Sequence, residues 1–256
     1  MSRYSASWAS PLGSLHPTLQ LHIDALPTPS CALHTQISLP PHFIADKFQL
    51  VQLHREGKLG AYESYSGGRD SFVHVGEADL EAPVWRAGEG SVLIRVRGAD
   101  DEDDEAGPKR IRLEVPLHLR YQAPVKERHL DGSRQDVIEV EFPYPHVFWA
   151  CPDSVSVPDL QACPAASLDP SFPHLPASTL HFLPANASTA AVSGCPPPSP
   201  APLTLRAPTG VQADLPFVET TTAATIWLCF AFLAWTAVST WRRSRREIVD
   251  EQKKRQ

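Results

Sequence analysis

Two short polar stretches have the residue types and spacing of catalytic or metal-binding motifs. Asp101, Glu102 and Asp103 match the D-x-D pattern with which many glycosyltransferases hold a metal–sugar-nucleotide, because paired carboxylates bind a hard cation through oxygen. The match lies within the acidic run Asp100–Glu105, where such a pattern is almost inevitable and mutual repulsion favours an open, solvated loop. We interpret the run as a loop and keep an enzyme that uses Asp101–Glu105 as the less favoured alternative.

The second stretch, His54-Arg55-Glu56, has the H-x-E spacing of zinc deaminases. The P-C-x-x-C segment that supplies the other zinc ligands in those enzymes is missing, so a polar surface loop is the better interpretation. G-x-S-x-G, P-loop, H-E-x-x-H and G-x-G-x-x-G motifs are also missing. We therefore predict that the chain is not an enzyme, and we assign no catalytic, cofactor-binding or metal-ligating residue.

A long apolar segment near the C-terminus must position the rest of the chain with respect to a membrane. Residues 221–241 carry no charged side chain, and a helix of that length rises about 31 Å, enough to cross the hydrocarbon core of a bilayer. Trp227, Trp235 and Trp241 add indole rings of the kind found near membrane interfaces. The sequence therefore predicts a single transmembrane helix over 221–241.

The charges after this segment predict its direction. The tail 242–256 has a net charge of +4 in a chain of net charge −6. Because short basic flanks stay cytosolic, we expect the tail in the cytosol and the preceding residues on the lumenal side. Lys253 and Lys254 have the spacing of the dilysine retrieval signal of endoplasmic reticulum membrane proteins. Residues 1–15 contain no apolar run of the length that a secretory signal needs, so the targeting signal stays open.

Alternating apolar residues before the span predict a mainly β domain. Residues 18–39 form two short alternating segments around a Pro-Thr-Pro-Ser turn, and 91–97 and 111–121 alternate more clearly. We expect the last two segments to pair as a hairpin whose loop is the acidic run. Further strands are predicted over 71–75 and 137–142. The aromatic stretch 141–152 is predicted to be an edge strand or an irregular plug on the core.

Residues 153–220 lose this periodicity and are rich in proline, alanine, serine and threonine, which is typical of an extended stalk. Asn186 begins an N-glycosylation sequon in this segment. Four cysteines precede the span and are compatible with two disulfides in an oxidising lumen, although four cysteines allow three pairings. The candidate disulfide cysteines are Cys31, Cys151, Cys163 and Cys195.

The sequence thus predicts five parts: a poorly defined N-terminus (1–17), a lumenal β domain (18–152), a Pro-rich stalk (153–220), a transmembrane helix (221–241) and a basic cytosolic tail (242–256). The expected fold is mainly β, an antiparallel sandwich-like domain plus one C-terminal transmembrane helix. The acidic charge of the part before the span argues against nucleic acid as a partner.

Three stretches carry a resemblance to a known family. They are Leu39–Leu50 (LPPHFIADKFQL), Val115–Gln122 (VPLHLRYQ) and Phe142–Cys151 (FPYPHVFWAC). In this order, and followed by one span and a basic tail, they resemble the PIG-X family, the small subunit of glycosylphosphatidylinositol (GPI) mannosyltransferase I. The resemblance covers about 39–151 and the span, and the second and third stretches are its most specific part.

The resemblance implies a non-catalytic subunit, without a cofactor, that stabilises a multi-spanning catalytic partner in the endoplasmic reticulum membrane. That partner moves the first mannose from dolichol-phosphate-mannose onto the GPI precursor. A lumenal chaperone or cargo receptor with broader clients is the alternative. For the residues that carry the match, core packing competes with a docking role, since aromatic residues and arginine dominate binding hot spots. The candidate partner contacts are His54, Arg55, Glu56, Arg120, Tyr121, Phe148 and Trp149.

Overall fold

The computed structural model describes residues 2–9, 14–26, 28, 30–56, 72–96, 109–126, 137–168, 172, 179–186, 194–198 and 200–254. The chain divides into two compact units. The first, which we call the β domain, comprises residues 1–123 and 134–209, and the second, the helical unit, comprises 124–133 and 210–256.

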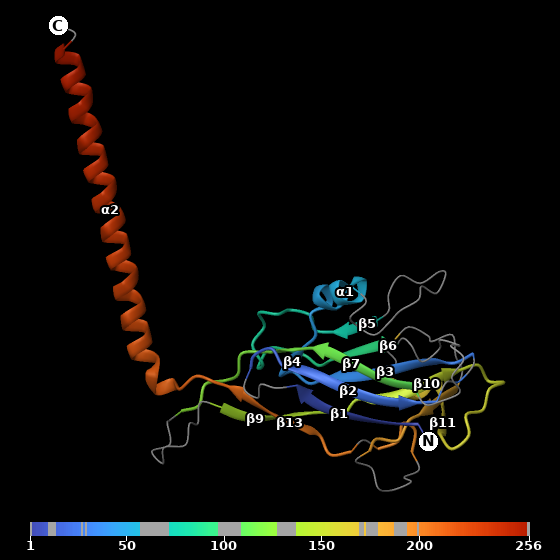
Figure 1. The fold of residues 1–256 in the computed structure, drawn as a ribbon. Helices are drawn as coiled ribbons and strands as arrows, with labels where there is room; N and C mark the ends of the chain where they lie inside the picture. Colours follow the sequence, from blue (N-terminus) through green and yellow to red (C-terminus); the bar gives the residue numbers. More distant parts are fainter. Residues whose placement is uncertain are drawn as a thin grey trace. The chain divides into compact units, whose positions relative to one another are not determined.

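Short strands are the main regular elements of the β domain (Figure 1). Among the described residues its elements are β1 (Arg3–Ala9), β2 (Thr18–Ala25), β3 (Ala32–Leu39), β4 (Phe43–Ile44), α1 (Lys47–Arg55), β5 (Phe72–Gly76), β6 (Gly90–Arg95), β7 (Lys109–Pro116), β8 (His118–Leu119), β9 (Val137–Phe142), β10 (His146–Cys151), β11 (Gln161–Pro164), a 3₁₀ turn η1 (Ala165–Ser167), β12 (Thr179–Phe182) and β13 (Leu203–Pro208). Figure 1 shows α1 lying beside β5 at one edge of the domain.

Two antiparallel sheets enclose the core of the β domain. One sheet has the strand order β1-β2-β7, and the other has the order β11-β12-β10-β3-β6-β5. Two further pairs, β13 with β9 and β4 with β8, are also antiparallel. The apolar side chains of β2, β3, β6, β7, β9, β10 and β13 meet in one continuous cluster. The prediction of a mainly β, sandwich-like domain is confirmed.

Alternation of apolar and polar residues explains the pairing of β2 with β7. Leu19 lies opposite Val115, and both side chains are fully buried. The neighbouring pair points outward, where the amide of Gln20 donates a hydrogen bond to the Glu114 carboxylate over 3.1 Å. Burial of each inward aliphatic side chain contributes about 1.5–3 kcal/mol, so the alternation selects this register over one shifted by a single residue.

β10 lies in the middle of the six-stranded sheet, between β12 and β3, and is buried on both faces. Val147 and Trp149 pack into the main core, whereas Phe148 and Ala150 pack into a second apolar cluster on the opposite face. The expectation of an edge strand or an irregular plug is therefore wrong. The two prolines that suggested it lie before the strand begins, and the strand itself is apolar on both parities because both faces are covered.

The hairpin predicted between residues 91–97 and 111–121 does not form. β6 pairs with β3 and β5 in the six-stranded sheet, whereas β7 pairs with β2 in the three-stranded sheet. Both strands bury one alternating face in the same core, so alternation predicts each strand but does not say which strand is its neighbour. The acidic run Asp101–Glu105 between them lies outside the described residues.

The segment predicted to be a stalk, 153–220, contains paired strands instead. β11 and β12 extend the six-stranded sheet beyond β10, and β13 pairs with β9. Leu180, Phe182 and Leu205 are buried in the two apolar clusters. These strands have only four to six residues each, too few for alternation to stand out within proline-rich sequence. The N-terminus, predicted to be poorly defined, contains β1, which pairs with β2.

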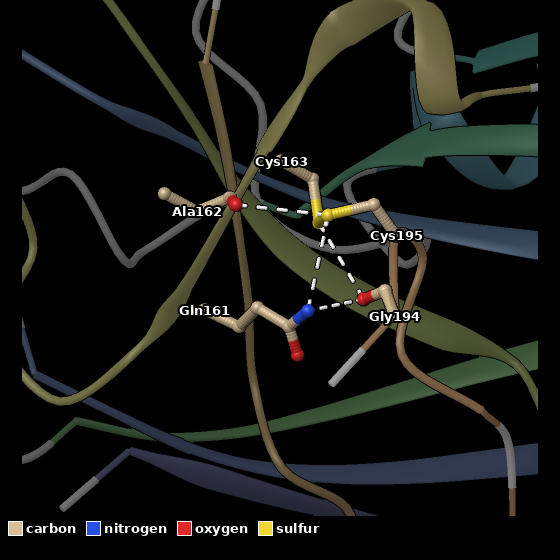
Figure 2. Close-up of a disulfide and its surroundings, with 5 residues drawn as sticks. All are labelled: Gln161, Ala162, Cys163, Gly194 and Cys195. Carbon is tan, nitrogen blue, oxygen red and sulfur yellow. Dashed lines mark hydrogen bonds between the residues drawn. A yellow bond between two sulfur atoms is a disulfide. The ribbon is translucent and has the colours of Figure 1, made fainter. Parts of the chain in front are cut away.

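Two disulfides link the four cysteines of the β domain. Cys31 immediately precedes β3 and is bonded to Cys151 at the end of β10, its neighbour in the sheet. Cys163 in β11 is bonded to Cys195, which ties residues 194–198 to the outer edge of the same sheet (Figure 2). The first bond therefore joins strands that the sheet already pairs, whereas the second attaches a segment outside the sheet to its edge strand.

The surroundings of the second disulfide add polar contacts between the same two segments (Figure 2). The side-chain amide of Gln161 donates a hydrogen bond to the carbonyl oxygen of Gly194 and lies 3.8 Å from Sγ of Cys195. Sγ of Cys195 lies 3.7 Å from the carbonyl oxygen of Ala162. Residues that looked like part of a free stalk in the sequence are thus attached to the folded domain.

The helical unit contains a 3₁₀ turn η2 (Gln212–Asp214) and a long helix α2 (Leu215–Lys254). Val125 donates a backbone hydrogen bond to Gly210 over 2.9 Å and accepts one from Gln212 over 2.8 Å. The segment Gln212–Arg243 is long and apolar enough to cross a membrane, and it is the one such segment among the described residues. The predicted span 221–241 lies within it.

Candidate partner-binding surface

Two of the three stretches that carry the family resemblance, far apart in the sequence, come together as β4 and β8. Phe43 lies opposite Leu119, and both side chains are buried. The ladder continues beyond the strands, where the N–H of Arg120 donates to the carbonyl oxygen of His42 over 2.9 Å. Nδ1 of His42 lies 2.8 Å from Oε1 of Gln122. Residues of the two stretches thus form one hydrogen-bonded unit.

The helix α1 follows β4 and is joined to the same unit. The Asp46 carboxylate accepts a hydrogen bond from the N–H of Phe48 over 2.8 Å and caps the helix. Nε2 of His118 lies 3.0 Å from Oε1 of Gln49, and its Nδ1 lies 2.9 Å from Nδ1 of His16. Burial, and then the neighbouring His16, lower the pKa of His118, which Asp46 opposes. At neutral pH His118 is therefore uncharged and connects the helix to β8.

Aromatic rings connect the third stretch to this unit. The ring centroid of Phe142 lies 4.8 Å from that of Phe43 in an edge-to-face arrangement. Trp8 of β1 stacks on Phe43 with centroids 5.7 Å apart. Beyond Phe142, the phenol oxygen of Tyr144 accepts a hydrogen bond from the N–H of Ala6 over 2.7 Å. All three stretches therefore meet around Phe43, and most of their side chains serve packing.

Two of the candidate partner contacts, Phe148 and Trp149, lie fully inside the β domain. Phe148 packs against Phe182 in the second apolar cluster, and Trp149 lies in the main core. Neither side chain has surface that a partner can touch, so a docking role for these two residues is wrong. Both faces of β10 are covered, so two consecutive aromatic residues can each be buried, one on each face of the sheet.

Arg120 is also buried, with 2% of its surface exposed, and it fixes the segment between β5 and β6. We call this segment, residues 77–89, the strap. The guanidinium of Arg120 donates hydrogen bonds to the carbonyl oxygens of Asp79 and of Ala82, the latter over 3.0 Å. Beside it, the N–H of Val84 donates to the carbonyl oxygen of Tyr121 over 3.3 Å. Arg120 is thus a positioning residue.

The strap and Tyr121 place exposed apolar side chains on the surface. Tyr121 is 69% exposed, Trp85 is 62% exposed and Leu80 is 46% exposed. Large aromatic side chains are among the residues that contribute most to protein–protein binding when a partner covers them. Trp85 and Leu80 were not identified from the sequence. The one signal that could have indicated them is a tryptophan within a polar segment that has no periodicity. We define Leu80, Trp85 and Tyr121 as the candidate partner-binding surface.

The remaining candidate contacts, His54, Arg55 and Glu56, lie at the C-terminal end of α1. Glu56 caps the helix, and its backbone N–H donates to the carbonyl oxygen of Gln52 over 3.0 Å. The side chains of the same two residues also bond, with the Gln52 amide donating to the Glu56 carboxylate over 2.9 Å. Arg55 is exposed and His54 is half-buried. The stretch predicted as a polar loop is thus a helix end, and its contact role stays a prediction.

Asn186 is exposed and directly follows Ala185, which forms an isolated β-bridge with Tyr4. The backbone N–H of Asn186 donates a hydrogen bond to the carbonyl oxygen of Tyr4 over 2.8 Å. Lys253 and Lys254 are at the end of α2. The retrieval signal at these two lysines and the glycosylation of Asn186 stay predictions.

Within the described parts of the chain, no group of three or more His, Cys, Asp or Glu side chains is arranged to hold a metal ion.

Comparison with known proteins gives one family. The profile of the PIG-X / PBN1 family matches residues 13–238. Protein pbn1 of Aspergillus oryzae is 33% identical over 164 residues, which cover 58% of this chain and 26% of that protein. Protein PBN1 of Gibberella zeae is 34% identical over 155 residues, which cover 59% of this chain and 28% of that protein. No solved structure matches the chain.

In the described part of the chain, a β-sandwich-like domain precedes one helix able to span a membrane, which places the protein among single-helix proteins with an extramembrane β domain. The chain belongs to the PIG-X / PBN1 family. Membership associates it with GPI-anchor biosynthesis. The matched region covers only about a quarter of the length of the Aspergillus and Gibberella proteins.

Proposed function

We propose that this chain is a non-catalytic, stabilising subunit of the GPI mannosyltransferase I complex, which adds the first mannose to the GPI precursor. The β domain lies in the lumen of the endoplasmic reticulum, α2 crosses the membrane once, and the basic tail is cytosolic. The catalytic subunit is a separate, multi-spanning protein. That protein uses dolichol-phosphate-mannose as its donor, and this chain holds no cofactor.

One observation carries this proposal. The three stretches that give the chain its family resemblance meet around Phe43, where their polar groups bond to one another and their rings pack together. Among the described residues, the exposed side chains beside them include Tyr121, Trp85 and Leu80, which suit contact with another protein rather than acid–base or nucleophilic chemistry. A stabilising subunit needs such a contact surface and no catalytic set.

The physical mechanism is preferential binding. A subunit that binds the folded catalytic chain, and not its unfolded form, lowers the unfolded fraction by mass action. At a free concentration a hundred times its Kd, the subunit stabilises the folded partner by about 2.7 kcal/mol. Such a shift changes the amount of a marginally stable membrane protein several-fold, because quality control removes the unfolded fraction.

Affinity capture of the tagged full-length chain from mild detergent tests the proposal. We expect one multi-spanning protein in roughly equal amount, and we expect mannose transfer to the GPI precursor in the captured material. Recovery of many unrelated clients without a stoichiometric partner would instead indicate a chaperone or cargo receptor and contradict the proposal.

Neutralisation of the acidic run distinguishes a non-catalytic subunit from an enzyme that uses these carboxylates. The variant Asp100→Asn/Asp101→Asn/Glu102→Gln/Asp103→Asn/Asp104→Asn/Glu105→Gln removes every carboxylate of the run that a bound metal could use. A non-catalytic subunit keeps the mannose transfer of the captured complex at the wild-type rate. Loss of turnover in a complex that still assembles contradicts the proposal and assigns the chemistry to this chain.

A further inference from the structure

The strap is held in a fixed shape although it lies at the surface. At its base Gly76 pairs with Gly90, and Gly76 has a φ of +96°. A Cβ at Gly76 would collide with the carbonyl group of Glu89, so the close approach of the two strap ends requires glycine. The strap is therefore closed where it leaves β5 and where it enters β6.

Hydrogen bonds within the strap fix its first half. The carboxylate of Glu77 accepts from the N–H of Asp79 over 2.9 Å, and the carboxylate of Asp79 accepts from the N–H of Glu81 over 2.9 Å. In the second half, the N–H of Arg86 donates to the carbonyl oxygen of Pro83 over 2.9 Å. These local bonds fix the strap between its closed ends.

Arg120 joins this fixed segment to the family stretch at β8. The guanidinium of Arg120 loses hydration when it is buried, and its charge-assisted hydrogen bonds to the strap offset part of that cost. Its hydrogen-bond partners in the strap are backbone carbonyl groups, so the bonds fix the path of the chain, and the carboxylates of Glu77 and Asp79 lie close enough to interact with its charge. The arrangement preorganises Trp85 and Tyr121, which lowers the entropy lost when a partner binds.

The charge of the strap defines the chemistry of that partner. Residues 77–89 contain four acidic residues and one basic residue, a net charge of −3, and Asp79, Glu81 and Glu89 are exposed. An acidic surface repels anionic lipid headgroups and attracts lysine and arginine. Exposed indole and phenol rings also attract these cations through their faces. Aromatic and acidic groups together therefore suit a basic segment of a protein.

We propose that Leu80, Trp85 and Tyr121, with the acidic side chains of the strap, bind a basic segment of the catalytic membrane subunit on the lumenal side. This inference rests on the proposed function and adds the surface and the chemistry of its ligand. A partner anchored in the membrane is favoured because this chain itself contains a helical segment, Gln212–Arg243, that is long and apolar enough to cross one.

The test compares variants of the full-length tagged chain in cells from which the untagged chain has been deleted. The double variant Trp85→Ala/Tyr121→Ala removes both rings, and we expect at least a tenfold fall in the amount of catalytic subunit captured. Phe48→Ala is the matched control, because Phe48 is 72% exposed on α1 and lies outside the strap. The control keeps wild-type capture. Equal losses in both variants contradict the proposal.

Charge reversal tests the basic ligand. Glu81→Lys/Glu89→Lys changes the net charge of the strap from −3 to +1 and is expected to lower capture by about tenfold at physiological salt. Captured wild-type complex is expected to decrease as sodium chloride rises, because salt screens attraction between opposite charges. Unchanged or increased capture by the charge-reversed chain overturns the proposal.

The failures of the two proposals are distinguishable. If the wild-type chain captures no multi-spanning mannosyltransferase, the proposed function fails. If the wild-type chain captures it and the double variant captures it equally well, the proposed function stands and the strap is not the binding surface. Formation of both disulfides in each variant, measured by thiol alkylation, shows that the β domain has folded.

Discussion

The guanidinium of Arg120 donates a hydrogen bond to the carbonyl oxygen of Ala82 over 3.0 Å, and this bond joins the end of β8 to the strap. Arg120 belongs to one of the three family stretches, whereas Ala82 lies in a segment that the resemblance does not single out. Through this bond a buried arginine determines where the exposed Trp85 and Tyr121 are presented. The relationship connects the fold of the β domain to its proposed binding role.

Replacement of Arg120 by methionine is expected to release the strap. The variant keeps apolar volume but removes hydrogen bonds from a charged donor, which lowers the free energy of unfolding by about 2–3 kcal/mol. Hydrogen exchange of the Val84 amide, which bonds to Tyr121, is expected to accelerate. Denaturant unfolding of the detergent-solubilised chain and exchange mass spectrometry measure the two effects.

Arg110→Met serves as the control for this variant. The Arg110 side chain is 92% exposed, so its loss is expected to change the free energy of unfolding by less than about 0.5 kcal/mol. If Arg120→Met behaves like this control and Val84 exchange is unchanged, Arg120 does not hold the strap.

The stability of the β domain is expected to fall between about pH 6.5 and pH 4 because of His34. Burial, and the nearby Arg95, lower the pKa of His34 to about 4, although its ring nitrogen bonds to the Ala32 carbonyl oxygen. Between the two pKa values the unfolded chain binds a proton that the folded chain does not, so stability decreases as pH falls. A shift from about 6.5 to about 4 corresponds to about 3 kcal/mol, fully present above pH 6.5.

Urea unfolding at pH 7 and at pH 5 measures this dependence. His34→Gln cannot take up the proton and is expected to lose part of the slope. Burial also lowers the pKa of His74, His118, His146 and His181, so these histidines keep the remainder. An unfolding free energy of His34→Gln with the same pH slope as the wild type would show that His34 is not the source.

The two disulfides are expected to contribute unequally to stability. Cys31 and Cys151 are separated by 120 residues, and Cys163 and Cys195 by 32, so loop-closure entropy gives about 5 and about 4 kcal/mol respectively. The double variants Cys31→Ala/Cys151→Ala and Cys163→Ala/Cys195→Ala are compared by unfolding midpoint under non-reducing conditions. A larger loss from the second pair contradicts the expected order.

Glycosylation at Asn186 tests the lumenal orientation of the β domain. We expect the wild-type chain to carry a glycan that an endoglycosidase removes and that Asn186→Gln lacks, because Asn186 is exposed in a turn. A sequon placed in the tail 242–256 serves as the matched control and is expected to stay unmodified. Modification of the tail sequon with no glycan on Asn186 indicates the opposite orientation.

Strands with clear alternation could be predicted from the sequence, but their neighbours could not. Leu19 and Val115 each lie in an alternating segment, and both segments form the strands expected. Nothing in either segment indicates that β7 pairs with β2 rather than with β6, because pairing depends on which sheet closes over the core. β12 was missed for another reason, since four residues are too short to show a period.

Only part of the candidate partner-binding surface could be predicted from the sequence. Tyr121 was identified because it lies in a family stretch, and Arg120 was identified with it, although burial makes Arg120 a positioning residue. Trp85 was missed because its segment has no period and no motif, and the strap that carries it is held by a hydrogen bond from Arg120 to Ala82, 38 residues away in the sequence. Long-range contacts of this kind are a property of the folded chain.

The lifetime of the catalytic mannosyltransferase subunit in the endoplasmic reticulum tests the central claim most directly. Pulse-chase labelling compares its half-life in cells that contain this chain, lack it, or carry it with Trp85→Ala/Tyr121→Ala. The account predicts a several-fold shorter half-life without the chain, full restoration by the wild type and little restoration by the double variant. An equal half-life in cells with and without the chain, together with normal GPI-anchored proteins at the surface, would contradict it.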